Sequence, residues 1–177
     1  SATSATAGTT VKLTATPAEG YTLDYFTLDG ARINGNTFIM PARNVDVSAV
    51  FTANAYSITV VQPTGGTVSA SATSAAAGTT VKLTANPAEG YTLDYFTLDG
   101  ARINGDTFSM PARNVEVSAV FTANAYSITV VQPTGGTVSA SKLSAFFGEA
   151  VDLTAVPDEG YELSHYVVNG AANNGGT

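Results

Sequence analysis

Apolar and polar residues alternate along much of the chain, and this alternation predicts short β-strands. In residues 56–62, Tyr, Ile and Val alternate with Ser and Thr, and the same seven residues return at 126–132. A period of two is typical of a strand with one buried face. Residues 81–85 alternate in the same way with Lys82 on the polar face, and residues 91–98 are rich in aromatic and branched side chains. No window has the helical i, i+3, i+4, i+7 pattern over three turns, so no substantial helix is expected, and the small residues 74–77 predict a turn.

Glycine and proline separate these predicted strands. Asp99-Gly100 and Asn104-Gly105 are the two dipeptides most typical of type I′ hairpin turns. Residues 101–103 between them are too few for more than a connecting strand, and residues 115–121 form the last strand before the next repeat. We therefore predict about six short antiparallel strands per repeat, with turns set by Pro87, Gly90, Gly100 and Gly105. The predicted core comprises Val81, Leu83, Tyr91, Leu93, Phe96, Val117 and Phe121.

The chain repeats itself with a period of 70, because the string GTTVKLTA begins at Gly8 and again at Gly78. A weaker copy, GEAVDLTA, begins at Gly148. Residues 1–70 and 71–140 are identical at 65 of 70 positions. If a repeat begins at Tyr56, residues 56–125 (repeat 2) are complete, residues 1–55 (repeat 1) lack the first strand and residues 126–177 (repeat 3) lack the last strands. If it begins at Ser1, two complete repeats precede 37 further residues, and the sequence does not decide between these phases.

A repeat of this size buries a modest share of its surface, so neighbouring repeats are expected to support one another. The predicted fold class is therefore all-β: tandem small antiparallel β domains in an elongated array.

Composition removes several classes of function. The 177 residues carry a formal net charge of −7, contain no Cys and only one His, and 12% of them are charged. A disulfide framework or a cysteine-ligated metal is therefore excluded, and nucleic acid or an anionic membrane is not expected as a partner. No apolar run has the length of a membrane span, and no signal peptide is expected because the first residue already lies inside a repeat.

Three segments of each repeat carry a resemblance to a known family. They are YSITVVQPTGGTVSAS, AGTTVKLTANPAEGYTLDYFTLDG and GDTFSMPARNVEVSAVF. Their order resembles the divergent B-repeat of internalin-type bacterial surface proteins, related to the Listeria–Bacteroides repeat. The match runs along the whole chain. Family members carry a Trp where this chain has Tyr95-Phe96, and repeat 3 has no T-F-x-M-P segment.

The resemblance implies a fold, a location and a role. It implies a small β-rich domain, in some relatives a β-grasp arrangement, and an extracellular or cell-surface location in bacteria. It also implies tandem repeats between an anchor and a distal functional domain, often in adhesins or large secreted enzymes. It implies no catalytic residues.

The residues themselves point to no catalytic, cofactor or metal site. The only His, His165, replaces an aromatic residue of the other repeats, so no histidine relay recurs. Asp29 and Asp99 open Asp-Gly turns, where Asp is favoured for backbone reasons. The segments Asn104–Thr107 and Asn173–Gly176 have too few oxygen ligands for a calcium loop. We therefore expect the chain not to be an enzyme and to need no cofactor.

Exposed aromatic rings offer the main candidate for ligand binding. Tyr25 and Tyr95 lie at equivalent positions beside Phe26 and Phe96, and a ring and its neighbour cannot share one face of a strand. One ring per repeat could therefore stack against a glycan, although core packing and cross-strand pairing explain the same residues.

Three functions remain open on the sequence. The leading hypothesis is a non-catalytic stalk or spacer that projects a distal domain from a bacterial surface, with neighbouring repeats of the same chain as partners. The second is a filament formed by strand exchange between incomplete repeats of different copies. The third is weak multivalent binding of a surface glycan or host protein.

Overall fold

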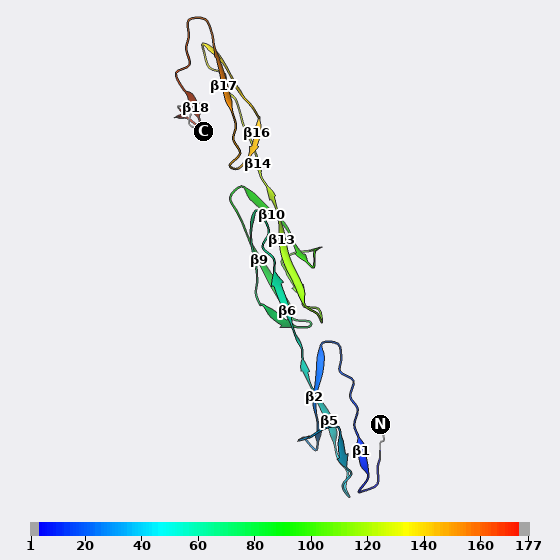
Figure 1. The fold of residues 1–177 in the computed structure, drawn as a ribbon. Helices are drawn as coiled ribbons and strands as arrows, with labels where there is room; N and C mark the ends of the chain where they lie inside the picture. Colours follow the sequence, from blue (N-terminus) through cyan, green and yellow to red (C-terminus); the bar gives the residue numbers. More distant parts are fainter. Residues whose placement is uncertain (1–3, 174–177) are drawn as a thin grey trace. The chain divides into compact units, whose positions relative to one another are not determined.

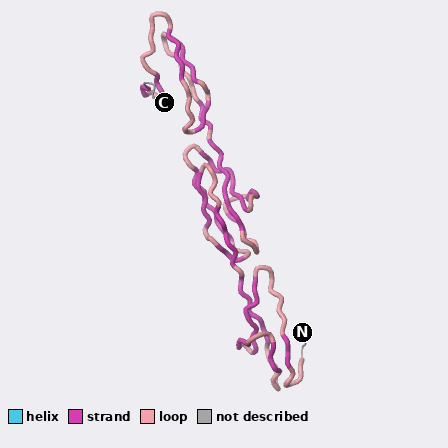
Figure 2. Tube along the Cα trace, viewed as in Figure 1, coloured by secondary structure: helices cyan, strands magenta, loops and turns pink. Residues whose placement is uncertain are grey.

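The computed structural model describes residues 4–173, and those residues form strands, turns and loops with no helix (Figures 1 and 2). Residues 1–3 and 174–177 lie outside the described residues. These residues are the start of repeat 1 and the end of repeat 3, and the latter includes most of the segment Asn173–Gly176. The all-β prediction is confirmed. No helical segment with the length and hydrophobicity of a membrane span occurs among residues 4–173.

The chain divides into two compact parts. The first comprises Ser1–Gln62, Val68–Thr84 and Tyr95–Ala119, and the second comprises Pro63–Thr67, Ala85–Asp94 and Val120–Thr177.

Repeat 2 contains eight strands in two sheets. In chain order they are β6 (Ala55–Val60), β7 (Gly66–Ala70), β8 (Ser74–Ala76), β9 (Thr80–Pro87), β10 (Tyr91–Leu98), β11 (Ala101–Ile103), β12 (Thr107–Ser109) and β13 (Val115–Ala123). One sheet has five strands in the order β11-β10-β13-β6-β8, and the other has three in the order β12-β9-β7. The residues predicted to form a turn at 74–77 include β8, which pairs antiparallel with β6. Its small side chains do not alternate between apolar and polar, so the local sequence does not indicate a strand. The strand forms because β6 provides a pairing partner.

The first and last strands of repeat 2 lie side by side and run in the same direction (Figure 1). Ile58, Thr59 and Val60 of β6 pair in parallel register with Val115, Glu116 and Val117 of β13. The Val61 N–H donates to the Val117 carbonyl oxygen at 2.9 Å. By contrast, the pairs β6-β8, β9-β12 and β10-β11 are antiparallel. A parallel pair needs a long connection, and here almost the whole repeat forms the connection from β6 to β13.

The core of repeat 2 lies between its two sheets. Val81, Leu83, Phe96 and Val117 are buried, whereas Tyr91, Leu93 and Phe121 of the predicted core are half-buried. Six further buried side chains complete this core: Ile58, Val68, Phe108, Met110, Val115 and Ala119. Lys82 points away from it, with 65% of its side chain exposed and its Nζ 3.6 Å from an Asp106 carboxylate oxygen.

The two predicted hairpin turns differ. Asp99 and Gly100 both have positive φ, at 49° and 77°, as a type I′ turn requires, and they join β10 to β11. The prediction of a type I′ hairpin at Asn104-Gly105 is wrong. Only Gly105 of that dipeptide has positive φ, at 84°, and the strands on either side of it belong to different sheets. The turn therefore carries the chain from one sheet to the other.

Repeats 1 and 3 contain parts of the same arrangement. Repeat 1 has β1 (Thr10–Lys12), β2 (Tyr21–Leu28), β3 (Ala31–Ile33), β4 (Thr37–Ile39) and β5 (Val47–Ala53), with sheets β1-β4 and β3-β2-β5. Repeat 3 has β14 (Ala125–Ser127), β15 (Gly136–Ala140), β16 (Ser144–Phe146), β17 (Leu153–Pro157), β18 (Tyr166–Val168) and β19 (Ala171–Asn173). These six strands form three separate pairs, β14-β16, β15-β17 and β18-β19.

Candidate functional site

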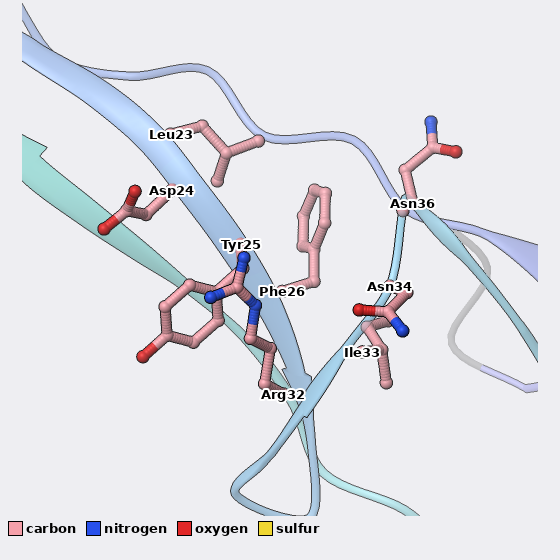
Figure 3. Close-up of a pocket in the computed structure, with 9 residues that line it drawn as sticks. Leu23, Asp24, Tyr25, Phe26, Arg32, Ile33, Asn34 and Asn36 are labelled. Carbon is pink, nitrogen blue, oxygen red and sulfur yellow. The ribbon is translucent and has the colours of Figure 1, made fainter.

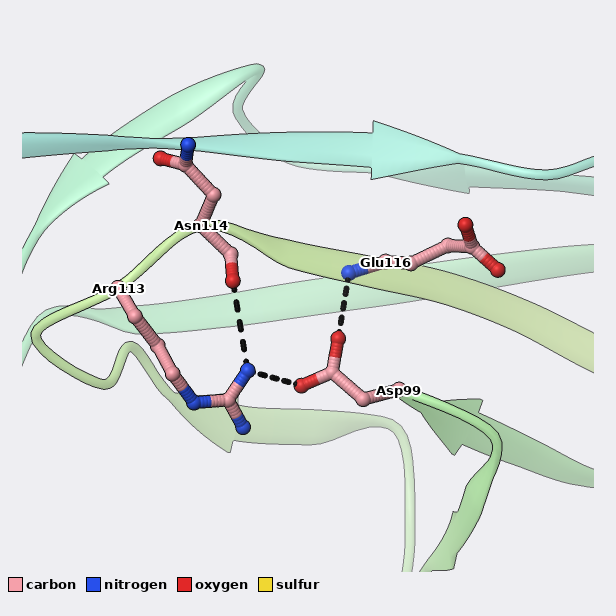
Figure 4. Close-up of polar contacts among 4 residues, drawn as sticks. All are labelled: Asp99, Arg113, Asn114 and Glu116. Atoms are coloured by element: carbon pink, nitrogen blue, oxygen red, sulfur yellow. Dashed lines mark hydrogen bonds and ion pairs between the residues drawn. The ribbon is translucent and has the colours of Figure 1, made fainter.

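An ion-paired cluster ties the β10–β11 turn of repeat 2 to the start of β13 (Figure 4). One carboxylate oxygen of Asp99 accepts a hydrogen bond from the Glu116 N–H at 2.9 Å, and the other pairs with the Arg113 guanidinium. Arg113 also donates to the Asn114 carbonyl oxygen at 3.3 Å. The Asp99 carboxylate is held in its charged form, because the Glu116 N–H and then Arg113 lower its pKa from the usual value. A carboxylate held ionised in this way stabilises a turn and is not suited to act as a general acid.

Repeat 1 contains the same cluster. Asp29 accepts from the Asp46 N–H at 2.9 Å and pairs with Arg43 at 2.6 Å. The Asp46 N–H and Arg43 lower the pKa of Asp29 as well. The sequence shows Asp and Arg recurring together in both repeats. Two short strands and their turns separate the Asp from the Arg each time, so local pattern alone does not reveal that they meet.

A small pocket lies beside Tyr25 in repeat 1 (Figure 3). It has a volume of about 320 Å³. The Arg32 guanidinium lies over the Tyr25 ring, 4.5 Å from the ring centre, and Arg102 lies over Tyr95 at 4.7 Å in repeat 2. The remaining lining residues are apolar, acidic and amide side chains with one glycine: Leu23, Asp24, Phe26, Ile33, Asn34, Gly35 and Asn36.

The arginines reduce the ring surface of these tyrosines to which a ligand could bind. Tyr25 and Tyr95 are half-buried, and one face of each ring is occupied by a guanidinium. A sugar stacking on that face would have to displace the arginine. Arg32 and Arg102 were not predicted from the sequence, although each lies seven residues after its tyrosine across the Asp-Gly turn.

Two polar side chains hold the segment from β6 to β7 in place. Gln62 donates from Nε2 to the Val68 carbonyl oxygen at 2.8 Å and accepts at Oε1 from the Val68 N–H at 3.0 Å. Asn114 accepts at Oδ1 from the Ser57 N–H at 2.9 Å, which ties the start of β13 to β6. The sequence pattern predicts only a strand end at Gln62 and a turn at Asn114, so it misses both of these bridging roles.

The remaining candidate groups do not converge. His165 is exposed, with its Nδ1 3.0 Å from the hydroxyl of the adjacent Ser164. Across residues 4–173, no three His, Cys, Asp or Glu side chains lie close enough together to hold a metal ion. No buried side-chain polar atom in that range lacks a hydrogen-bond partner.

Comparison with known families covers nearly the whole chain. The family model for the divergent InlB B-repeat domain matches residues 1–55, 56–125 and 126–174. The chain belongs to this family. The divergent InlB B-repeat is a repeat domain of bacterial surface proteins and is typically non-catalytic. No curated protein and no solved structure matches the chain.

Within this B-repeat chain, the polar side chains described above join neighbouring parts of the backbone. The Asp–Arg pair stabilises a turn, and the Gln and Asn side chains bridge strands. The family resemblance predicted from the sequence is confirmed.

Proposed function

We propose that this chain is a non-catalytic, load-bearing segment of an extracellular bacterial surface protein and acts as a stalk or spacer for a distal domain. The observation that carries the proposal is the parallel pairing of the first and last strands of repeat 2. The family context supports a surface location.

The direction of the two strands determines how they respond to tension. The chain enters repeat 2 at the N-terminal end of β6 and leaves it at the C-terminal end of β13. Because the strands are parallel neighbours, tension on the chain slides one along the other and loads their hydrogen bonds together. Opening one bond at a time would require a pull across the strands.

The contacts between these strands extend beyond the backbone ladder. The Ser118 hydroxyl donates to the Val61 carbonyl oxygen at 2.8 Å, and Asn114 accepts from the Ser57 N–H at 2.9 Å. Ile58, Val115 and Val117 are buried in the core behind the pair. Sliding therefore breaks polar contacts and exposes apolar surface in the same step, which gives a high barrier to unfolding under force.

Pulling the full chain by its two ends tests this proposal. We expect a cooperative unfolding step for repeat 2, with a length gain equal to the extended length of residues 56–125, about 230–250 Å, minus the end-to-end distance of the folded repeat. Ser118→Ala removes one bond between the strands and should lower the force of that step. Ser48→Ala is the matched control, because Ser48 occupies the same position in repeat 1, where residues 4–55 include no counterpart of β6.

Gradual extension without a distinct step would contradict the load-bearing role. An equal loss of force in the two serine variants would also contradict it.

A further inference from the structure

One residue separates the last strand of a repeat from the first strand of the next. β5 of repeat 1 ends at Ala53 and β6 of repeat 2 begins at Ala55, so Asn54 alone lies between them. Asn124 has the same place between β13 and β14. A connection this short bends mainly at the two soft dihedral angles of the asparagine. The contacts of this residue therefore determine how freely one repeat moves against the next.

Both the backbone and the side chain of Asn54 are bonded to repeat 1. The Asn54 N–H donates to the Gly20 carbonyl oxygen at 2.7 Å. Its Oδ1 accepts from the Thr22 hydroxyl, also at 2.7 Å. Asn124 makes the same two bonds, both of 2.7 Å, to the equivalent glycine and threonine of repeat 2. The connecting residue is therefore fixed to the repeat that precedes it.

The glycine that is bonded to Asn54 also contacts the following repeat. Gly20 is buried and has φ of 81°. A Cβ there would lie 3.0 Å from the Ala77 Cβ and 3.7 Å from the Ala112 Cβ. Both alanines belong to repeat 2 and, like Gly20, to the first compact part of the chain. Because glycine has no side chain, the backbone of repeat 1 reaches these two alanines directly.

The two alanines lie on loops that hydrogen bonds join to each other. Ala77 precedes Gly78, whose N–H donates to the Met110 carbonyl oxygen at 2.7 Å, and the Met110 N–H donates to the Thr79 carbonyl oxygen at 2.8 Å. Ala112 follows two residues after Met110. The same two bonds occur in repeat 1, at 2.8 and 2.9 Å. The surface that receives the glycine is therefore part of the fold of each repeat.

The second boundary has the same contact with a larger side chain. Phe147 has the position in repeat 3 that Ala77 has in repeat 2. A Cβ at Gly90 would overlap the Phe147 side chain, and both residues belong to the second compact part of the chain. The bare backbone of one repeat thus meets the same position of the next repeat twice, whether that position holds alanine or phenylalanine.

We propose that this contact is a joint that holds two successive repeats in one orientation. The joint consists of Gly20, Thr22 and Asn54 on one repeat and of Ala77 and Ala112 on the next. The partner that fits the surface at Gly20 is the following B-repeat, which is recognised by close backbone packing rather than by charge. This inference does not depend on the spacer function, because a spacer can also contain flexible boundaries.

Residual dipolar couplings of the full chain test whether the joint holds. Repeats in a fixed orientation share one alignment, so repeats 1 and 2 should have equal degrees of order in the wild type. Gly20→Ala should make them unequal, because the new Cβ displaces Ala77. Gly35→Ala is the matched control: Gly35 has the same φ of 81°, and a Cβ there has no heavy atom within 4 Å, so equality should remain. Unequal order in the wild type, or equal order in Gly20→Ala, overturns the proposal.

Hydrogen exchange of the Asn54 amide provides a second measurement with milder variants. Thr22→Val removes the hydroxyl that holds the Asn54 side chain and should raise the exchange rate of the Asn54 N–H about five-fold. Thr52→Val is the matched control. Thr52 lies opposite Thr22 in the β2–β5 pair, and its hydroxyl bonds Asp24 within repeat 1 at 2.8 Å, so this variant should leave the rate unchanged. Equal exchange rates in the two threonine variants also overturn the proposal.

Discussion

Ile58 lies directly opposite Val115 in a parallel strand pair, although the two residues are close to opposite ends of repeat 2. Both side chains are buried, at 5% and 4% exposure. This pair closes the repeat, because each side chain removes the other from water and the strands that carry them exchange hydrogen bonds. Closure buries the core: repeats 1 and 2 are nearly identical in sequence at equivalent positions, yet their equivalent core residues differ in burial.

The same substitution in repeats 1 and 2 should have different effects on stability. Val117→Ala creates a cavity in a closed core and should lower the free energy of unfolding of repeat 2 by about 2 kcal/mol. Val47→Ala removes the same atoms from a half-exposed side chain and should cost less than about 0.5 kcal/mol. Urea unfolding monitored by NMR signals of each repeat measures both. Equal losses would show that closure by β6 does not determine burial.

The Asp99 cluster should make stability depend on pH in the acidic range. The pKa of Asp99 is lower in the folded chain than its usual value of 3.8, so the contribution of this carboxylate is present above that value. It is lost as the pH falls from about 3.8 through the lower folded pKa. The urea concentration at the unfolding midpoint of repeat 2 should therefore decrease as the pH is lowered through this window. Asp99→Asn keeps a residue that tolerates positive φ, and it should make this decrease smaller. A pH profile unchanged by Asp99→Asn would contradict this assignment.

Two glycines with similar backbone conformation should differ in their tolerance of alanine. Gly65 has φ of 88°, and a Cβ there would lie 2.4 Å from the Tyr91 ring. Gly105 has φ of 84°, and a Cβ there would have no heavy atom within 4 Å. Gly105→Ala should cost about 1 kcal/mol from backbone strain alone, and Gly65→Ala should cost more because the ring must also move. Thermal unfolding of the two variants compares them directly, and equal costs would contradict the close approach of Tyr91.

Much of the fold follows from local sequence. The repeat period, the alternating strands and the type I′ turn at Asp99-Gly100 all have local signatures, and each is present in the structure. Parallel pairing of β6 with β13 has none, because alternation identifies a buried face but not the partner strand. The strand Ser74–Ala76 was missed for the same reason, since its formation depends on β6.

The candidate sites were harder to predict than the strands. Arg32 reaches Tyr25 across a turn, and Arg113 reaches Asp99 from beyond β11 and β12. Neither spacing belongs to a strand or a helix motif. Such pairs can be predicted only when the turns and the sheet order are known.

The glycan-binding alternative for Tyr25 and Tyr95 has its own test. It predicts that the wild-type chain is retained on a glycan array and that the double variant Tyr25→Ala, Tyr95→Ala is not. Because Arg32 and Arg102 cover one face of each ring, their replacement by Ala should increase retention if the rings are the binding surface. A wild-type chain that no glycan retains would remove this alternative.

The most direct test of the load-bearing role compares two directions of pull on repeat 2. The chain contains no Cys, so introduced cysteines are unique attachment points. The double variant Ala55→Cys, Ala125→Cys loads β6 against β13 along their length, whereas Ala55→Cys, Ala112→Cys peels them apart from their N-terminal ends. We predict a clearly higher unfolding force for the first variant at the same loading rate. Equal forces, or a higher force for the second variant, would contradict the role of the parallel strand pair.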